Sequence, residues 1–449
     1  MTPRSTPWKA FLVFLGPLML SNILQSLSGT INNVYLGQMI GVRALAAVSA
    51  FFPILFFFIS FILGLGTGAS VLIGQAHGAR DLGKVKAIAG TALAVALVGG
   101  LAVSLFGGAF TRTLLAMLGT PADILLDATA YAHVVLLSIP GLFAFLLVTA
   151  MMRGVGDTVT PLLSLVVFTA VGLLVTPALI RGWAGLPALG VTSGAWASLG
   201  SLLVTLAWLA VHLRRRGHPL APDATLLRAL WVDWKLLRAV LRIGVPSGVQ
   251  IVVVALAEVA VLSLVNGFGS DATAAYGVVT QVLSYVQFPA MSIAITASIL
   301  GAQAIGAGHA DRLGDITRAG LVLNLLITTS LVVLTLLCSR AIIGLFITSP
   351  SVIELAQGLL HIVLWSSILL GMAGVLGGVM RASGTVLAPT AISISCILAV
   401  ELPVAYLLSR RIGIDGVWIA YPVTFGAILA LQAIYYRQVW RKRAIHRMV

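Results

Sequence analysis

The sequence predicts an all-α integral membrane protein with 12 transmembrane helices, and three observations predict this fold class. Apolar residues make up 59% of the 449 positions and charged residues only 9%, whereas soluble domains carry about 25% charged residues. The mean hydropathy is +1.08. Because a helical span needs about 20 apolar residues, a chain of this length has room for about a dozen spans. These values exclude a soluble enzyme, a disordered scaffold and a secreted disulfide protein.

A walk along the chain with a window of about 20 residues locates the expected spans. The first begins after a basic segment that lacks a small-residue cleavage site, so we expect it to be retained. The two cysteines, Cys338 and Cys396, lie inside apolar runs and predict neither a disulfide nor a metal site. The predicted spans are 11–36, 45–73, 87–110, 124–150, 160–180, 190–213, 243–268, 273–303, 319–338, 352–379, 388–409 and 413–436.

Basic residues gather on one side of the predicted spans. Most of the 27 Lys and Arg residues lie at the two ends of the chain or after even-numbered spans. The positive-inside rule therefore predicts a multi-pass protein of the inner (plasma) membrane with both termini in the cytoplasm. This topology accounts for the net charge of +14, so we expect no nucleic-acid partner. The exceptions, after odd-numbered spans, are Arg43, Arg112, Arg181, Arg340, Arg410 and Arg411.

The two halves of the chain repeat each other at a shift of about 228 residues. The string MRGVGDTVTP at 152–161 matches MRASGTVLAP at 380–389, and His133 pairs with His361. Each half holds six predicted spans, an even number, so both enter the membrane in the same direction as parallel repeats. The expected domains are an N-terminal six-helix lobe (1–213), a basic cytoplasmic linker (214–242), a C-terminal six-helix lobe (243–436) and a basic cytoplasmic tail (437–449).

Two six-helix lobes around a cleft are typical of a secondary transporter with alternating access. The chain has no GxxxxGK[ST] loop, which disfavours a nucleotide-driven pump. Two alternatives stay open. A flippase of a lipid-linked glycan or a lipid would favour a basic cavity, but few basic residues lie deep in the spans. A membrane-embedded transferase would need a catalytic cluster, and the string from His77 to Asp81 is interpreted instead as a helix connector. We therefore expect no enzyme and no catalytic residues.

Glu258 and Glu401 are the only acidic residues expected deep within a span. An ionisable group in mid-bilayer costs from about 2.5 to above 10 kcal/mol, so its presence indicates function. Glu258 lies about 15 residues into its span, near the midplane. It can take up a proton or serve as a Na⁺ ligand. Glu401 is followed by Pro403, which frees a carbonyl group and can open the helix. With His361, these two residues are the candidate cation-coupling groups.

Neutral polar side chains predict a cavity that binds substrate by dispersion and adaptable hydrogen bonds. They suit a small amphiphilic guest, including a cationic one. The candidate residues of the substrate cavity are Asn22, Gln25, Asn32, Asn33, Gln250, Gln281, Tyr285, Gln287, His133 and Met291.

Four features of the chain carry a family resemblance: the segment from Leu15 to Pro53, the GVPSGVQ opening of span 7, the string VNGFGSDATAAYGVVTQV, and the two MR-x-x-G repeats. Together they resemble the multidrug and toxic compound extrusion (MATE) family, in its bacterial NorM-like and DinF-like branch. The resemblance covers nearly the whole chain. It implies a V-shaped bundle of two lobes and export of organic cations or other amphiphiles in exchange for H⁺ or Na⁺. Glu258 matches the coupling glutamate of span 7 in NorM-like members.

The sequence departs from this family in two places. Asn32 stands where the family often has aspartate, and the body of span 10 carries no acidic residue. These departures move the expected coupling toward the C-terminal lobe and leave the ion open, with protons preferred over Na⁺. We expect no cofactor other than the coupling ion. The lipid bilayer and small amphiphilic substrates are the expected partners, and the protein is expected to work as a monomer.

Overall fold

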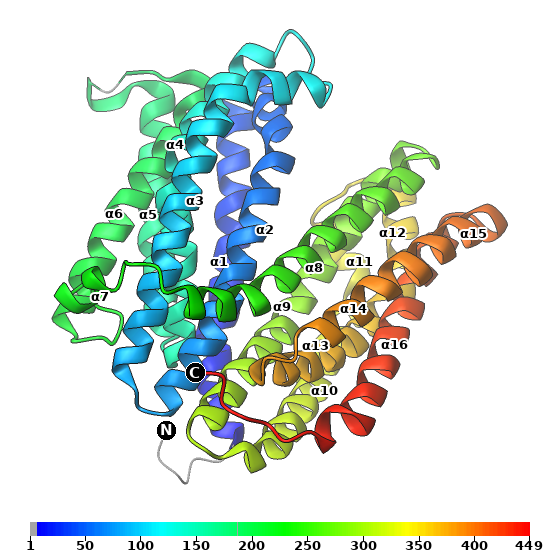
Figure 1. Ribbon diagram of the computed structural model, residues 1–449. Helices are drawn as coiled ribbons and strands as arrows, with labels where there is room; N and C mark the ends of the chain where they lie inside the picture. Colours follow the sequence, from blue (N-terminus) through cyan, green and yellow to red (C-terminus); the bar gives the residue numbers. More distant parts are fainter. Residues whose placement is uncertain (1–6, 186) are drawn as a thin grey trace. The chain divides into compact units, whose positions relative to one another are not determined.

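The computed structural model describes residues 7–185 and 187–449, and the side chains of Asn33, Val42 and Ala184 lie outside the described residues. All regular secondary structure in the described part is helical (Figure 1). The first half contains α1 (Pro7–Met39), α2 (Val42–Gly78), α3 (Leu82–Met117), α4 (Leu125–Val155), α5 (Val159–Arg181), α6 (Ser193–Arg215) and α7 (Ala224–Arg228). The second half contains α8 (Trp234–Asn266), α9 (Ser270–Gly306), α10 (Leu313–Leu337), α11 (Ser339–Gly344), α12 (Pro350–Val363), α13 (Ser367–Ala382), α14 (Leu387–Cys396), α15 (Leu402–Ile412) and α16 (Ile414–Gln438).

Twelve helical segments of the described chain are long and apolar enough to cross a membrane. Each overlaps one predicted span, so the predicted all-α fold with 12 membrane helices is confirmed. Two spans contain two α-helices each. The tenth joins α12 and α13 through the 3₁₀ turn Leu364–Ser366, and the eleventh joins α14 and α15 through the π-helical segment Ile397–Glu401.

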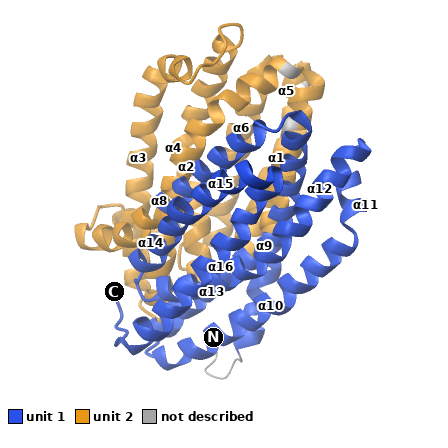
Figure 2. Cartoon of the chain, turned by 90° about the vertical axis from the view of Figure 1, so that its right-hand side faces the viewer, with its two compact units in different colours: residues 1–19, 249–449 blue, residues 20–248 orange. Residues whose placement is uncertain are grey.

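The chain forms two compact units, coloured separately in Figure 2. Unit 1 contains Met1–Met19 and Val249–Val449, and unit 2 contains Leu20–Gly248. The divisions therefore fall inside α1 and α8, whereas the sequence-based domains follow composition and charge. The first helix contributes to unit 1 through Phe11, which is fully buried and lies beside Gly320 of α10.

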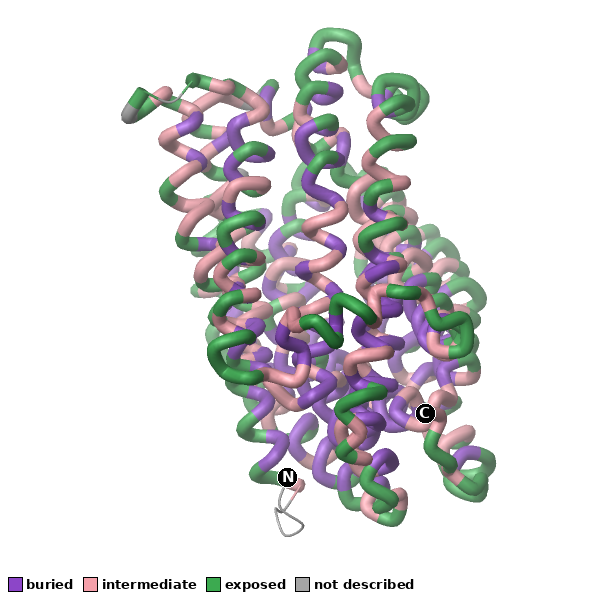
Figure 3. Tube along the Cα trace, turned by 60° about the vertical axis from the view of Figure 1, so that its left-hand side comes forward, coloured by how far each residue is buried: buried purple, intermediate pink, exposed green. Residues whose placement is uncertain are grey.

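Within unit 2, α4 packs against α2, α3 and α6, and α5 packs against α6. The first part of α8 crosses α2 closely. A Cβ atom at Gly64 would lie 2.4 Å from the carbonyl oxygen of Gly244, so a side chain larger than that of glycine would force the two backbones apart. Buried residues follow the inner faces of the helices, and exposed residues the outer faces and ends (Figure 3). Apolar side chains such as Leu105 and Leu174 are largely exposed, as expected for lipid-facing positions.

Within unit 1, α13 packs against α9, α10 and α16, and α15 packs against α16. An apolar core of α8, α9, α12 and α16 surrounds Trp418, which is fully buried. The rings of Tyr276, Trp418, Tyr421 and Phe425 follow one another at centroid distances of 5.4–6.0 Å. This aromatic row fixes the position of the two tyrosine hydroxyl groups that belong to the site described below.

The internal repeat recurs in the ends of equivalent helices. Helices α2 and α9 both have 37 residues and both follow a glycine with positive φ, Gly41 or Gly269. Helices α4 and α13 both place an arginine, Arg153 or Arg381, in the last turn. The carbonyl group of each arginine accepts a hydrogen bond from the glycine three residues later, at 2.9 Å in both cases. The two halves therefore share local geometry as well as sequence.

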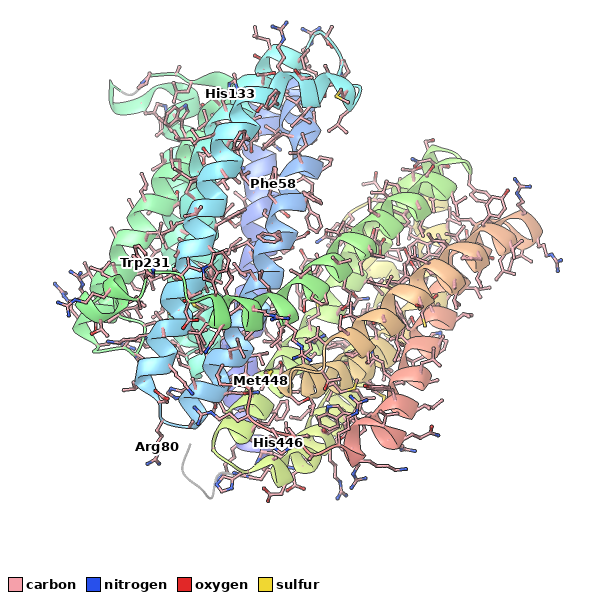
Figure 4. All side chains as sticks on the ribbon, in the orientation of Figure 1. Phe58, Arg80, His133, Trp231, His446 and Met448 are labelled. Atoms are coloured by element: carbon pink, nitrogen blue, oxygen red, sulfur yellow. The ribbon has the colours of Figure 1, made fainter. Side chains whose placement is uncertain are left out.

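The segment between α6 and α8 runs along unit 2 and is held by polar contacts. Lys86 of α3 forms an ion pair with Asp223, and the hydroxyl of Thr91 accepts a hydrogen bond from the backbone N–H of Asp233 at 3.3 Å. The ring of His218 lies 3.6 Å from the carboxylate of Asp157. Trp231, labelled in Figure 4, is 88% exposed. This exposure suits the interfacial position expected of a membrane-protein indole.

Candidate ion and substrate sites

Unit 1 encloses a cavity of about 420 Å³ between its membrane-spanning helices. The cavity is lined by residues of several helices: α8, α9, α13, α14, the π-helical segment and α16. Each side of the cavity therefore belongs to a different helix. Its ionisable side chains are Glu258, Glu401, Arg381 and Tyr421. The polar neutral residues of its lining are Gln250, Thr280, Ser284, Gln287, Ser393 and Gln432.

Glu258 is held in this cavity by two tyrosines. The hydroxyl of Tyr276 on α9 donates a hydrogen bond to Oε2 of Glu258 at 2.6 Å, and that of Tyr421 on α16 donates to the same oxygen at 3.2 Å. A hydrogen bond to an ionised carboxylate is roughly twice as strong as one between neutral groups. Both described donors use one carboxylate oxygen. The arrangement fixes the direction of the carboxylate and suits it to bind a cation or a proton.

Glu401 lies at the end of the π-helical segment and is only 5% exposed. Pro403 sits near the start of the following helix, where it supplies no N–H for the ladder. The π-helical segment has wider turns than an α-helix, and such segments occur where the regular hydrogen-bond ladder is disturbed. It therefore agrees with the local opening of the helix that this proline predicts. The opening places a buried carboxylate in the cavity that also contains Glu258.

Two more predicted residues line the unit 1 cavity. Gln250 accepts a hydrogen bond from the hydroxyl of Thr390 at 3.4 Å, and Gln287 faces the cavity from α9. The structure therefore brings together Glu258, Glu401, Gln250 and Gln287, which come from three spans that the sequence separates by up to about 150 residues.

Unit 2 contains a second cavity, of about 270 Å³. The predicted residues Gln25 and Asn32 line it from α1, together with Tyr35, Thr169, Thr176, Ser198 and Ser201. The rings of Phe145 and Phe168, also in the lining, stack with centroids 6.2 Å apart. Its lining carries no Asp, Glu, Lys, Arg or His among the described residues. This cavity can bind a guest by ring stacking and neutral hydrogen bonds.

Other predicted site residues lie outside the linings of these two cavities. The ring of His133 contacts the carbonyl oxygen of Gly108 at 3.0 Å, and Figure 4 shows it at the end of unit 2 opposite Arg80. The ring of His361 lies 3.2 Å from the hydroxyl of Ser339. Both rings thus connect neighbouring helices. The side chain of Asn33 lies outside the described residues. The remaining members of this group are Asn22, Gln281, Tyr285 and Met291, of which Met291 is 54% exposed.

Sequence reasoning missed four polar members of the unit 1 site. Tyr276 and Tyr421 donate to Glu258, and Arg381 and Gln432 line the cavity. The sequence marked Arg381 only as part of the MR-x-x-G repeat, and no periodic pattern distinguishes a tyrosine that faces a carboxylate from one that packs in a core. The folding of the eighth, tenth and twelfth spans against the seventh brings these groups together.

Within the described part of the chain, no group of three or more His, Cys, Asp or Glu residues is arranged to hold a metal ion. A Na⁺ ion prefers oxygen ligands, and the unit 1 cavity offers carboxylate, amide and hydroxyl oxygens. Its donor set is therefore chemically compatible with Na⁺ as well as with H⁺.

Twelve helical spans, an internal repeat and two carboxylates in one cavity between the spans are the features of a membrane transporter. The MatE family model matches residues 17–178 and 246–407, which are two stretches separated by the repeat spacing. The chain therefore belongs to the MatE family.

Known proteins support this assignment over the full length. The chain is 44% identical to the "Probable multidrug resistance protein YoeA" of Bacillus subtilis (strain 168), over 99% of this chain and 97% of the relative. It is 24% identical to the "Probable multidrug resistance protein NorM" of Thermotoga maritima, over 96% and 92% of the two chains. A crystal structure of MATE in complex with MaL6 shares the fold with a TM-score of 0.89 at 21% identity, over 97% of this chain and 96% of that chain.

Proposed function

We propose that this MatE-family protein is a multidrug efflux transporter that exports amphiphilic and cationic organic compounds in exchange for H⁺ or Na⁺ by alternating access. The names of its relatives support the multidrug substrate class. One observation supports ion coupling above the others: Glu258 and Glu401 line the same cavity of unit 1. Of the two ions, we favour the proton, with Glu258 as the primary coupling group.

The two carboxylates favour the binding of a cation in the cavity. Two ionised carboxylates in a site of low polarity repel each other, and a bound proton or monovalent cation removes the repulsion. The hydroxyl groups of Tyr276 and Tyr421 orient Glu258 for this event. Glu401, at the π-helical segment, supplies the second charge on a helix with a locally disturbed hydrogen-bond ladder. A helix of this kind can change shape when the ion binds or leaves.

The driving force is sufficient for efflux. A proton that enters across about 100 mV and about one pH unit releases about 3.7 kcal/mol, enough for about 500-fold accumulation of a neutral or zwitterionic substrate. A monovalent cation exchanged one for one uses only the pH term, because the two charges cancel across the membrane. Electrogenic export of such a cation needs at least two coupling ions, for which the two carboxylates are available.

The experiment is transport of the cationic dye rhodamine 123 in proteoliposomes under an imposed pH gradient or Na⁺ gradient. We expect Glu258→Gln to lower gradient-driven transport at least tenfold, because the amide removes the ionisable group while keeping its size. Glu354→Gln is the matched control, since Glu354 is an exposed acidic residue of α12 in the same unit, outside the cavity lining.

The two imposed gradients distinguish H⁺ from Na⁺ as the coupling ion. Transport driven by the pH gradient alone would identify H⁺, and transport driven only by Na⁺ would identify Na⁺. Transport by Glu258→Gln at the native rate would contradict the coupling role of Glu258. Failure of the native protein to transport the dye under either gradient would contradict the proposed function.

We also propose that the protein resides in the inner membrane with both termini in the cytoplasm and acts as a monomer. The distribution of Lys and Arg supports this orientation, because basic residues concentrate at the termini and after even-numbered spans. Both cavities lie within a single chain, which supports action as a monomer.

A further inference from the structure

Arg381 is a charged residue of the unit 1 cavity that the coupling scheme does not use. It lies in the last turn of α13, is partly buried, and lines the cavity with the two carboxylates. Among the described residues, no carboxylate lies within ion-pair distance of its guanidinium group, and no acceptor forms a hydrogen bond with its side chain. A partly buried guanidinium group has lost part of its hydration, so a ligand oxyanion that pairs with it binds favourably.

The position of Arg381 at a helix end does not explain its place in the cavity. A cation in the last turn of a helix interacts favourably with the terminal carbonyl groups. The repeat provides a direct comparison, because Arg153 occupies the same place at the end of α4. Arg153, however, does not belong to the lining of the unit 2 cavity. Both arginines lie at a helix end, but Arg381 also lines the unit 1 cavity, so the helix end alone does not account for its position.

Gln432 provides a complementary group in the same cavity. Its side chain is 4% exposed, and its Nε2 donates to the carbonyl oxygen of Pro389 at 3.4 Å and to the hydroxyl of Ser393 at 3.3 Å. Its Oε1 is buried and has no partner among the described residues. A Cβ atom at Gly377 would lie 3.4 Å from this oxygen and 3.6 Å from Nη1 of Arg381. Gly377 therefore has both groups beside it, one a donor and the other an acceptor.

We propose that Arg381 and Gln432 form a substrate subsite in which Arg381 holds the carboxylate or phosphate group of a zwitterionic amphiphile and Gln432 accepts a donor of the same guest. A guanidinium group presents parallel N–H donors that match the two oxygens of such a group. The free Oε1 of Gln432 accepts an N–H or O–H donor of the same guest. This inference rests on the proposed transport function and specifies a substrate class for it.

The charges of the cavity agree with a zwitterionic guest. With both carboxylates ionised, Glu258, Glu401 and Arg381 sum to one negative charge, and a single bound proton brings the sum to zero. A zwitterion then enters and leaves without changing the net charge. Exchange of a zwitterion for one proton is driven by both the membrane potential and the pH gradient, which together support about 500-fold accumulation of the substrate. Exchange of a monovalent cation for one proton is driven by the pH gradient alone, which supports about tenfold accumulation.

The test uses two dyes that differ by one group. Rhodamine 110 carries a free carboxylate and is zwitterionic, and rhodamine 123 is its cationic methyl ester. Fluorescence polarisation measures the affinity of the purified full-length protein for each dye, and proteoliposomes measure their transport. Because a hydrogen bond to a charged group contributes appreciably, we expect Arg381→Gln to weaken rhodamine 110 binding about tenfold or more. Rhodamine 123 binding should stay the same or become tighter, since a like charge is removed.

Two further variants separate an ionic role from a structural one. Arg381→Lys keeps the charge without the planar donor pair, so rhodamine 110 affinity should fall between those of the native protein and Arg381→Gln. Arg153→Gln removes the repeat-related arginine and should leave the affinity for both dyes unchanged. Equal weakening of both dyes by Arg381→Gln, or unchanged rhodamine 110 affinity, would overturn the subsite.

The two dyes also distinguish failure of this inference from failure of the proposed function. Transport of rhodamine 123 with no binding of rhodamine 110 would overturn the subsite alone, and binding of neither dye would overturn both. Nanodiscs of phosphatidylcholine and of phosphatidylglycerol identify the source of the anion. Competition by phosphatidylglycerol with rhodamine 110 in the native protein, and its loss in Arg381→Gln, would assign the subsite to a lipid headgroup and overturn its assignment to the substrate.

Discussion

The cavity of unit 1 carries two carboxylates and an arginine, whereas the cavity of unit 2 is lined by neutral side chains. The internal repeat allows the residues that line the two cavities to be compared position by position. Pairing Pro17 with Pro246 places Gly29 opposite Glu258, and the shift that pairs the two MR-x-x-G strings places Leu173 opposite Glu401. Both Gly29 and Leu173 line the unit 2 cavity. Equivalent positions of the two repeats therefore face cavities in both units, with different chemistry.

The two repeats keep the same helical scaffold while their cavities carry different side chains. Matching helix ends and caps set the same local geometry in each half. The charge of a cavity depends on single side chains, which can change without disturbing the packing of the helices around them. Unit 1 has the groups that can respond to a coupling ion, and unit 2 has a stacked aromatic pair and neutral hydrogen-bonding groups.

The largest effect that would sharpen this comparison concerns the tyrosines of unit 1. We expect the double variant Tyr276→Phe with Tyr421→Phe to lower gradient-driven rhodamine 123 transport about tenfold, because both described hydrogen bonds to Glu258 are lost while the rings stay. Proteoliposome transport measures the effect. Tyr285→Phe on α9 is the control, since Tyr285 lies outside the cavity lining. Native transport by the double variant would show that Glu258 does not depend on these donors.

A smaller effect is expected from a carboxylate placed in unit 2. Asn32→Asp has nearly the same shape and adds a negative charge to the neutral cavity. We expect it to raise rhodamine 123 affinity about threefold to tenfold, from the Coulomb attraction between partly screened charges. Fluorescence polarisation measures the change, with Asn32→Leu as the uncharged comparison. If Asn32→Asp and Asn32→Leu bind the dye equally, the unit 2 cavity does not receive the cationic group.

The smallest effect concerns the linker of unit 2, where His218 lies outside the membrane spans. Burial lowers the pKa of His218 below its ordinary value of 6.5, the nearby Asp157 carboxylate raises this pKa in part, and the positive forms of His77 and His212 lower it further. Its Nδ1 accepts a hydrogen bond from the backbone N–H of Leu220 at 3.1 Å. The folded linker therefore favours the neutral ring.

The sign of the pH effect follows from that lowered pKa. The stability that neutral His218 gives the linker is fully present above pH 6.5 and is lost as the pH falls below this value. We expect faster hydrogen exchange of residues 217–223 at pH 5 than at pH 7.5, after correction for intrinsic rates. His218→Asn keeps an acceptor without a titratable ring, so it should reduce this difference. An equal pH dependence in the variant would assign the effect to other groups.

The membrane class, the number of spans, the internal repeat and the two deep carboxylates could all be predicted from the amino-acid sequence. These features are local or periodic: an apolar run long enough to cross the bilayer must be helical, because lipid offers its backbone no hydrogen-bond partners. An isolated acidic residue inside such a run stands out for the same reason. Glu258 and Glu401 could therefore be selected from the sequence, and the structure places them in one cavity.

Which polar residues lie side by side could not be predicted from the sequence, because it depends on how the helices pack. Gln281 and Gln287 lie six positions apart on α9, yet only Gln287 belongs to the unit 1 lining. Tyr276 donates a hydrogen bond to Glu258 from α9, whereas the ring of Tyr285 on the same helix packs against Phe288. The physical reason is that the rotation of each helix about its axis is fixed by packing against its neighbours, which periodicity in a nearly uniform apolar sequence does not specify.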